Sequence, residues 1–182
     1  MSEPIKLVAF CGSLRKASFN RLALQAFAER LPAGAACETI EIDWPLYSAD
    51  IQAQGFPAAV QAANQKVLAA DGIVFASPEY NYSVSGVLKN AIDWLSRLPN
   101  QPFAGKPVAL ESSSPSLFGG LRAQLHLRHM FVYLDGRVLN KPEVIIPQVN
   151  AKVDAATGEL TDPATRGFIA DQLKAFAAFV RG

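Results

Sequence analysis

Short apolar runs alternate with amphipathic segments along the whole chain. The runs at residues 5–10, 37–42, 72–76, 107–111 and 144–146 predict strands, the last from a weak signal. Apolar residues at helical spacing predict helices at residues 20–31, 58–70, 86–97, about 120–134 and 162–180. Strands that alternate with helices in this way indicate a parallel sheet covered by helices on both faces. We therefore expect a single α/β domain that spans residues 1–182.

The charge and hydrophobic content of the chain exclude some classes of binding partner. Of the 182 residues, 50% are hydrophobic, and 17 Lys and Arg stand against 16 Asp and Glu for a net charge of +1. No run of like charge is present, so neither nucleic acid nor an anionic membrane is an expected partner. No apolar stretch is long enough to span a bilayer, and the N-terminal MSEPIKLVAFCGS lacks the features of a signal peptide. We expect a cytoplasmic protein in which Cys11 and Cys37 are free thiols.

Small and polar residues gather in the loops after the first, third and fourth predicted strands, at residues 11–19, 77–85 and 112–119. Ligands of open parallel sheets bind beyond the carboxyl ends of the strands, so these loops are expected to lie together. The first loop, GSLRKASFN, brings Ser13, Arg15, Ser18 and Asn20 to the start of a helix. The unpaired N–H groups and dipole of a helix start attract anions, so the loop predicts a phosphate site. The simpler alternative is that Ser18 or Asn20 only caps the helix.

The spacing of the first loop excludes several phosphate-binding motifs. Gly12 is the only glycine before Gly34, so neither the G-x-G-x-x-G dinucleotide motif nor the P-loop is present. Ala17 stands where a low-molecular-weight phosphatase would carry its arginine. We therefore predict that Cys11 is a buried core residue and not a nucleophile.

The second loop is rich in flat and amide side chains. Aromatic rings and hydrogen-bonding groups in one loop suit a planar ring system with polar edges. The neighbouring phosphate site has neither the dinucleotide motif nor the P-loop. A phosphate site of this kind beside aromatic and amide side chains favours FMN. The alternative is that the two tyrosines cover the core and the remaining residues form the turn. The residues concerned are Pro78, Glu79, Tyr80, Asn81, Tyr82 and Ser83.

Two motifs carry a family resemblance. GSLRKASFN and PEYNYSVSGVLKNAIDWLSR, in this order, resemble the signatures of the NAD(P)H-dependent FMN reductase family, especially its bacterial chromate and quinone reductases. The resemblance implies a flavodoxin-like, doubly wound, five-stranded parallel sheet of order 2-1-3-4-5. It also implies the cofactor contacts: Ser13, Arg15, Ser18 and Asn20 on the phosphate, Leu14 and Phe19 through their backbones, residues 78–83 on the ring and ribityl chain, and Ser113 from the third loop. The sequence departs from the family pattern at Ser85 and at Ser116.

The resemblance also implies a reaction. A nicotinamide, NADPH or NADH, would reduce bound FMN, which would pass electrons to a quinone or a related acceptor such as an azo compound, free flavin or chromate, in ping-pong order. No side chain is expected to act as a catalytic acid or base. A flavodoxin-type electron carrier without nicotinamide oxidase activity is the alternative, and a flavin-free hydrolase is a more distant one.

The predicted helix at residues 119–134 carries more apolar surface than one sheet face needs. One apolar stripe consists of Leu127, Met130, Phe131 and Leu134, and another of Leu121, Leu125 and Val132. This surplus of apolar surface predicts a subunit interface, and the family resemblance likewise points to a homodimer or homotetramer. A polar stripe of Arg122, His126, His129 and Tyr133 would lie between them. No acidic residue or cysteine joins the two histidines on that face, so no metal site is expected.

Overall fold

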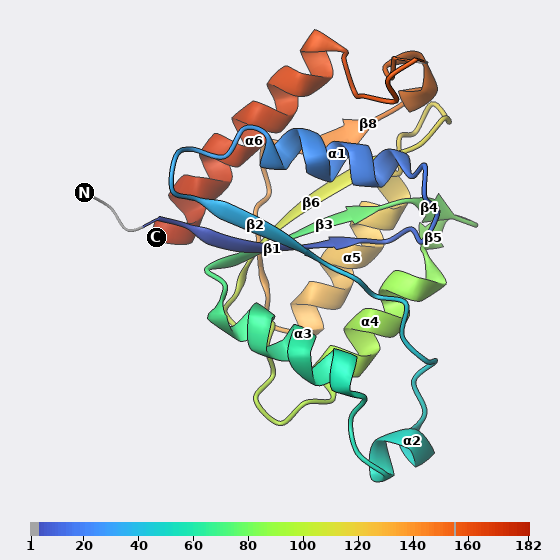
Figure 1. Cartoon of the computed structure of the whole chain (residues 1–182), viewed down its shortest axis with the longest axis vertical. Helices are drawn as coiled ribbons and strands as arrows, with labels where there is room; N and C mark the ends of the chain where they lie inside the picture. The colour runs from blue at the N-terminus through green and yellow to red at the C-terminus, as the bar shows by residue number, and fades with distance from the viewer. Residues whose placement is uncertain (1–3, 155) are drawn as a thin grey trace.

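A parallel sheet forms the centre of the computed structural model, which describes residues 4–154 and 156–182. The strand order is β2-β1-β3-β6, and β7 and β8 both pair with β6 at its outer edge (Figure 1). Met1 to Glu3, the start of the stretch considered above for targeting, lie outside the described residues. The strands are β1 (Lys6–Cys11), β2 (Ala36–Ile40), β3 (Gly72–Ser77), β6 (Pro107–Ser113), β7 (Arg137–Val138) and β8 (Val144–Ile146).

Helices cover both faces of the sheet, which confirms the predicted fold class. On one face, α1 and α6 pack on a core that includes Leu24, Phe27 and Ile169. On the other, α3, α4 and α5 pack on a core that includes Phe75 and Trp94 (Figure 1). The helices are α1 (Phe19–Ala28), α2 (Ala49–Ala53), α3 (Ala58–Ala69), α4 (Gly86–Ser96), α5 (Leu121–Tyr133) and α6 (Pro163–Arg181), with a 3-10 turn η1 (Val149–Ala151).

The fifth position of the sheet is occupied by two short strands instead of one. The chain leaves the sheet after β7, passes through the cis Lys141–Pro142 bond, and returns as β8. In the gap, the Leu110 carbonyl of β6 accepts a hydrogen bond from Gln172 Nε2 of α6 at 3.1 Å. From the opposite face, Gln124 Nε2 of α5 donates to the Val144 carbonyl at 2.7 Å. Two buried amides therefore satisfy carbonyls at the break in the sheet, where an unpaired buried group would be costly.

Several short elements were not predicted, among them α2 and a hairpin in the loop after β3. The helix α2 has five residues and begins at the N-cap Ser48, in a stretch that the sequence presents as a loop. The loop after β3 contains a small antiparallel hairpin of β4 (Glu79–Tyr80) and β5 (Ser83–Val84). Elements this short carry too few residues for a periodic pattern. The predicted start of the last helix is confirmed, because Asp162 accepts a hydrogen bond from Thr165 N at 2.8 Å.

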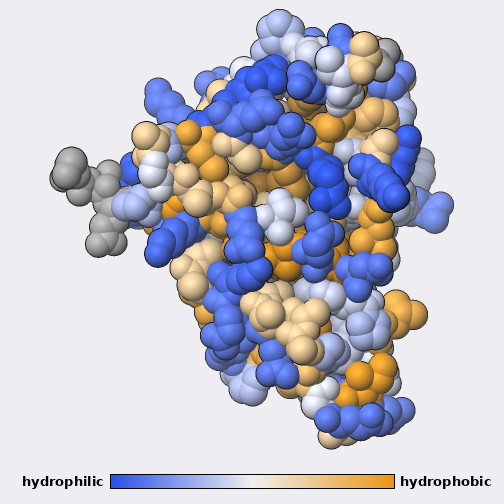
Figure 2. Space-filling model, viewed as in Figure 1, coloured by the Kyte–Doolittle hydropathy of each residue, from blue (hydrophilic) through white to orange (hydrophobic). Residues whose placement is uncertain are grey.

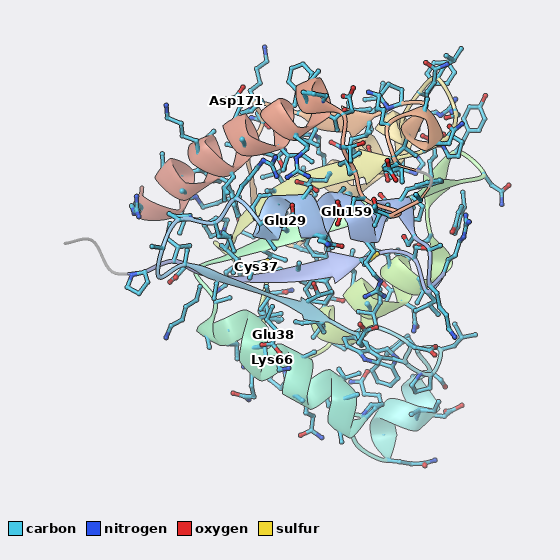
Figure 3. The ribbon with its side chains drawn as sticks, turned by 45° about the horizontal axis from the view of Figure 1, so that its top comes forward. Glu29, Cys37, Glu38, Lys66, Glu159 and Asp171 are labelled. Atoms are coloured by element: carbon cyan, nitrogen blue, oxygen red, sulfur yellow. The ribbon has the colours of Figure 1, made fainter. Side chains whose placement is uncertain are left out.

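The surface is mixed in character. Figure 2 shows hydrophilic and hydrophobic residues interspersed over one face of the molecule. Ion pairs there include Lys66 of α3 with Glu38 of β2, which lie side by side in Figure 3. Among the described residues, no helix combines the length and apolar character needed to cross a bilayer.

Candidate functional site

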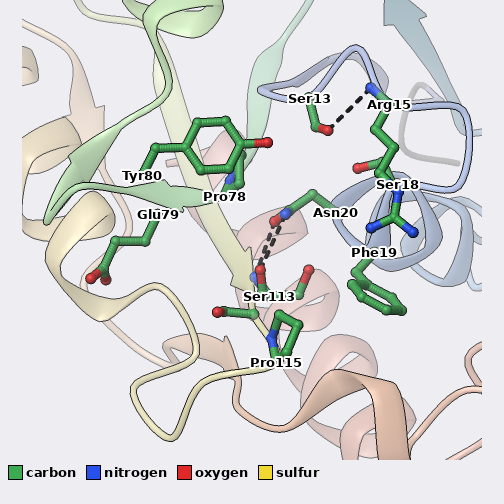
Figure 4. A pocket seen from close by; sticks show the side chains of 11 residues that line it. Ser13, Arg15, Ser18, Phe19, Asn20, Pro78, Glu79, Tyr80, Ser113 and Pro115 are labelled. Atoms are coloured by element: carbon green, nitrogen blue, oxygen red, sulfur yellow. Dashed lines mark hydrogen bonds between the residues drawn. The ribbon is translucent and has the colours of Figure 1, made fainter.

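The loops after β1, β3 and β6 meet around a cavity of about 170 Å³ (Figure 4). Parallel strands place their carboxyl ends at one edge of the sheet, which is why segments distant in sequence converge here. The sequence singled out most of the lining, and Ser114 and Pro115 are additional. The lining residues are Ser13, Arg15, Ser18, Phe19, Asn20, Pro78, Glu79, Tyr80, Ser113, Ser114 and Pro115.

The first loop forms the positively polarised end of the cavity. Ser18 is the N-cap of α1 and accepts a hydrogen bond from Arg21 N at 3.4 Å. The first turn of this helix contains no acidic residue, so its dipole is not compensated from within. Arg15 adds a full charge, with its guanidinium carbon 5.7 Å from the Phe19 ring centroid. This end of the cavity therefore has the chemistry of an anion site. The capping role of Ser18 is present as well, so the two interpretations of this residue are compatible.

Gly12 allows the first and second loops to approach each other closely. A Cβ at this position would lie 2.9 Å from Pro78 Cδ, which is too short for a real contact. Ser85, the N-cap of α4, donates its hydroxyl hydrogen to the Gly12 carbonyl at 2.6 Å and accepts from Leu88 N at 3.3 Å. Ser85 thus caps α4 and also ties the two loops together. Glycine at position 12 is required by packing across the site.

Asn20 joins the first loop to the third. Its Nδ2 donates to the Ser113 carbonyl at 3.2 Å, and its Oδ1 accepts from Ser113 N at 3.0 Å. The side chain is buried, so this pair of bonds is shielded from water. Asn20 therefore has a structural task besides the predicted contact with a phosphate, which stays a prediction. Ser113 Oγ is buried with no hydrogen-bond partner among the described residues, which leaves it available to a ligand.

The second loop presents only its first half to the cavity. Pro78, Glu79 and Tyr80 line the wall, and Figure 4 shows the Tyr80 ring turned towards the cavity and the Glu79 carboxylate turned away. Asn81 and Tyr82 form the hairpin turn, with φ values of 50° and 66°. They and Ser83 lie outside the cavity lining, as does the exposed Leu14 of the first loop. Contacts of these four residues with a cofactor stay predictions.

Glu79 is paired with the start of α5. Its carboxylate accepts hydrogen bonds from Arg122 Nε and, at 3.1 Å, from Arg122 N. The guanidinium carbon of Arg122 lies 3.8 Å from the Tyr82 ring centroid and 4.5 Å from that of Phe118. From the sequence, Arg122 was expected only in a polar stripe for subunit contacts. Helical spacing gives the face of a residue but not its partner, and Glu79 lies 43 residues earlier in the chain.

A second carboxyl, Glu111, is buried in β6, two residues before Ser113 of the cavity lining. Its exposed fraction is 0%, and neither carboxylate oxygen has a hydrogen-bond partner among the described residues. Desolvation raises the pKa of Glu111 to about 8. Strand alternation puts Glu111 on the same face of the sheet as Ser113, under α1 and α6. Its signal in the sequence is a single acidic residue directly after the apolar run at residues 107–110, and no role was predicted for it.

Cys11, Cys37 and His126 show no sign of a reactive thiolate or a metal site among the described residues. Cys11 is buried in the core below the first loop, as predicted, and both cysteines are free thiols. Desolvation, and then the charge of Glu111, raise the pKa of Cys37 to about 12, which disfavours the reactive thiolate. His126 Nδ1 shares a hydrogen bond of 2.8 Å with Ser83 Oγ. No cluster of three or more potential metal ligands occurs among the residues that the structure describes.

Comparison with known proteins agrees with this architecture. Residues 5–151 match the family model of NADPH-dependent FMN reductase. The chain belongs to this family. Over its full length it is 48% identical to a quinone reductase of Escherichia coli, of which it covers 98%. It is also 48% identical to an NAD(P)H-dependent FMN reductase of Pseudomonas aeruginosa, again over 100% of this chain and 98% of the relative.

Solved structures of other proteins share the fold of this chain. The flavoenzyme NAD(P)H:(acceptor) oxidoreductase of Paracoccus denitrificans superposes with a TM-score of 0.87 at 30% identity, covering 97% of each chain. A WrbA-like flavodoxin of Agrobacterium tumefaciens, at 20% identity and a TM-score of 0.59, shares the fold. The flavodoxin-like class inferred from the two sequence motifs is confirmed.

Proposed function

We propose that the protein is an FMN-dependent NAD(P)H:quinone oxidoreductase. The observation that carries this proposal is the cavity, in which an anion-attracting helix start and Arg15 face a wall of Pro78 and Tyr80. The printed functions of the full-length relatives support the same chemistry. We expect NADPH or NADH as the electron donor and a quinone or a similar flat molecule as the acceptor.

The cavity fits one part of FMN and leaves the rest at its mouth. Its volume of about 170 Å³ is below the roughly 300 Å³ at which small-molecule pockets begin. We infer that Ser13, Arg15 and Ser18 would hold the phosphate, while the ring would lie further out against Tyr80 and the hairpin. The unpartnered hydroxyl of Ser113 fits this arrangement, because it offers one hydrogen bond to a polar group of the ligand.

Within this proposal the side chains bind and orient, and none transfers a proton. FMN, when bound, supplies the hydride and electron chemistry between the nicotinamide and the quinone. The one carboxylate in the wall, Glu79, is held by Arg122 and turned away from the cavity. Tyr80 would restrict access from one side, with an exposed fraction of 51%. We propose that donor and acceptor occupy the same open side in turn, which would produce ping-pong kinetics.

The proposal is tested by adding FMN to the protein and then reducing it anaerobically with NADPH or NADH. We expect a yellow complex that either nicotinamide bleaches and a quinone reoxidises. Arg15→Gln should weaken FMN binding at least about tenfold through loss of a charge-assisted contact. Lys16→Gln, which removes a neighbouring charge outside the cavity lining, is the matched control. A protein that is colourless once unbound FMN has been removed refutes the proposal, and bound FMN that neither nicotinamide bleaches would favour an electron carrier.

We further propose a homodimer or homotetramer formed through the helix at residues 119–134. Leu127, Phe131 and Leu134 of the first stripe are buried, whereas Leu125 and Val132 of the second are exposed by 50% and 79%. Apolar groups left this exposed favour association. Light scattering on the purified protein should give two or four chains, and Val132→Asp should lower that number. A monomer at all concentrations would contradict the proposal.

Cytoplasmic location also stays a proposal, supported by the free thiols of Cys11 and Cys37. Cell fractionation tests it, and recovery of the protein outside the cytoplasm would refute it.

A further inference from the structure

The β4–β5 hairpin is too small and too strained to hold its own shape. It contains only the pairs Glu79 with Val84 and Tyr80 with Ser83, and a two-stranded hairpin in isolation is at best marginally stable. Both turn residues have positive φ, which suits Asn81 but is unfavourable for the bulky Tyr82. Contacts from outside the hairpin must therefore fix its position.

Contacts of this kind come from α5, and two of them are made by one guanidinium, that of Arg122. Arg122 Nε binds the Glu79 carboxylate at the first strand of the hairpin. The flat face of the same group stacks on Tyr82 at the hairpin turn and on Phe118 of the third loop. Hydrogen bonding in the plane and stacking above and below it can occur together, because the guanidinium is planar. One side chain thereby links three segments at the mouth of the cavity.

Glu79 in turn stabilises the start of α5, because it accepts a hydrogen bond from a backbone N–H of the first turn. The N-cap of this helix is Gly120, in a left-handed conformation and without a capping side chain. Glu79 Oε2 accepts from Arg122 N in the first turn, where a helix has unsatisfied donors and a favourable dipole for an anion. The Glu79 side chain is only 7% exposed. The positive charge of Arg122 therefore compensates a carboxylate that would otherwise be buried without a partner.

We propose that the Arg122–Glu79 pair is a positioning element that holds the hairpin against α5 and so fixes the wall on which the flavin ring is expected to lie. This inference rests on the proposed function for its cofactor and on the contacts above for its geometry. Ser83 and His126 add a second, weaker tether on the same side. Arg122 and Glu79 touch no reacting atom in this scheme and act only through the hairpin.

Lysine at position 122 is the informative substitution. Arg122→Lys keeps the positive charge but cannot stack between two rings while binding the carboxylate. The matched control is Arg128→Lys, because Arg128 lies on the same helix and pairs with Glu143, 3.4 Å away and outside the cavity lining. Glu79→Gln tests the other half of the pair, since the amide keeps the shape and loses the charge.

The first readout is amide hydrogen exchange of the protein without added cofactor. Arg122→Lys and Glu79→Gln should each speed exchange in residues 79–84 at least about tenfold, and should leave the buried centre of α5 unchanged. The double variant should add little to the larger single effect, because both changes break the same interaction. Unchanged exchange in the hairpin, an equal rise across the whole protein, or an equal effect of Arg128→Lys would each overturn the proposal.

The second readout is the FMN dissociation constant, measured by fluorescence titration. It should rise at least about fivefold in Arg122→Lys and change less than about twofold in Arg128→Lys. If the unaltered protein binds no FMN, the proposed function fails, while hairpin exchange still decides whether the pair positions the hairpin. If exchange rises but FMN affinity is unchanged, the wall is not part of the cofactor site, and the inference about the flavin is overturned.

Discussion

The buried carboxyl of Glu111 should make the protein less stable as pH rises. A glutamate in an unfolded chain has a pKa of about 4.3, whereas burial raises the pKa of Glu111 to about 8 in the folded protein. Between these values the folded state keeps a proton that the unfolded state has released. Stability from this group is therefore fully present below about pH 4 and is lost as pH rises through about 8.

The magnitude follows from the same two values. A change in pKa from about 4.3 to about 8 corresponds to a loss of about 5 kcal/mol in the free energy of unfolding across the interval. No screening by solvent reduces this figure, because the side chain is fully buried and has no partner among the described residues. Glutamine has nearly the same shape and does not ionise, so Glu111→Gln should abolish this pH dependence.

Urea unfolding at pH 5, 7 and 9 tests the prediction. We expect the Glu111→Gln variant to be within about 1 kcal/mol of the unaltered protein at pH 5 and about 4 kcal/mol more stable at pH 9. The control is Glu159→Gln, which removes an exposed carboxylate and should leave the pH dependence intact. Parallel stability curves for Glu111→Gln and the unaltered protein from pH 5 to 9 would refute the reasoning, because they would mean that Glu111 titrates alike in both states.

Two further substitutions test how the loops are held. Asn20→Asp should destabilise the protein by about 1–3 kcal/mol in thermal or urea unfolding, because a carboxylate cannot donate to the Ser113 carbonyl; unchanged stability would show that the Asn20 bonds are unimportant. Gly120→Ala should cost at least about 2 kcal/mol, since its Cβ would lie 2.6 Å from Ser112 Cβ at a φ of 93°. Gly158→Ala, also at positive φ but with open space around it, should cost less, and equal losses would assign the effect to the backbone alone.

Much of the sheet could be predicted because its central strands are buried on both faces. Strands β1 and β3 are apolar along most of their length, as is β6 up to Leu110, and such runs are informative without any partner in view. The division of the fifth strand could not be predicted. It depends on Gln172 reaching the Leu110 carbonyl from 62 residues away, and no local pattern encodes a contact over that distance.

The site shows the same division between local and long-range information. The first loop was predictable because the start of a helix, a small-residue turn and Arg15 suffice to suggest an anion site. The hairpin was not, because Asn-Tyr is an unusual turn pair and its conformation depends on Arg122 stacking on Tyr82. Sequence therefore identified which loops form the cavity, while their mutual contacts required the structure.

These contacts give the cavity a graded charge. One end combines Arg15 with the uncompensated start of α1, whereas the other is lined by Pro78 and Tyr80, without net charge. Two carboxyls nearby would oppose an anion, and each is prevented from doing so by a different means. Glu79 is neutralised by Arg122, and Glu111 keeps its proton near neutral pH because of its burial. A ligand with a strongly anionic end and a flat neutral head fits this gradient, and ionisation of Glu111 or loss of Arg122 would each weaken the fit.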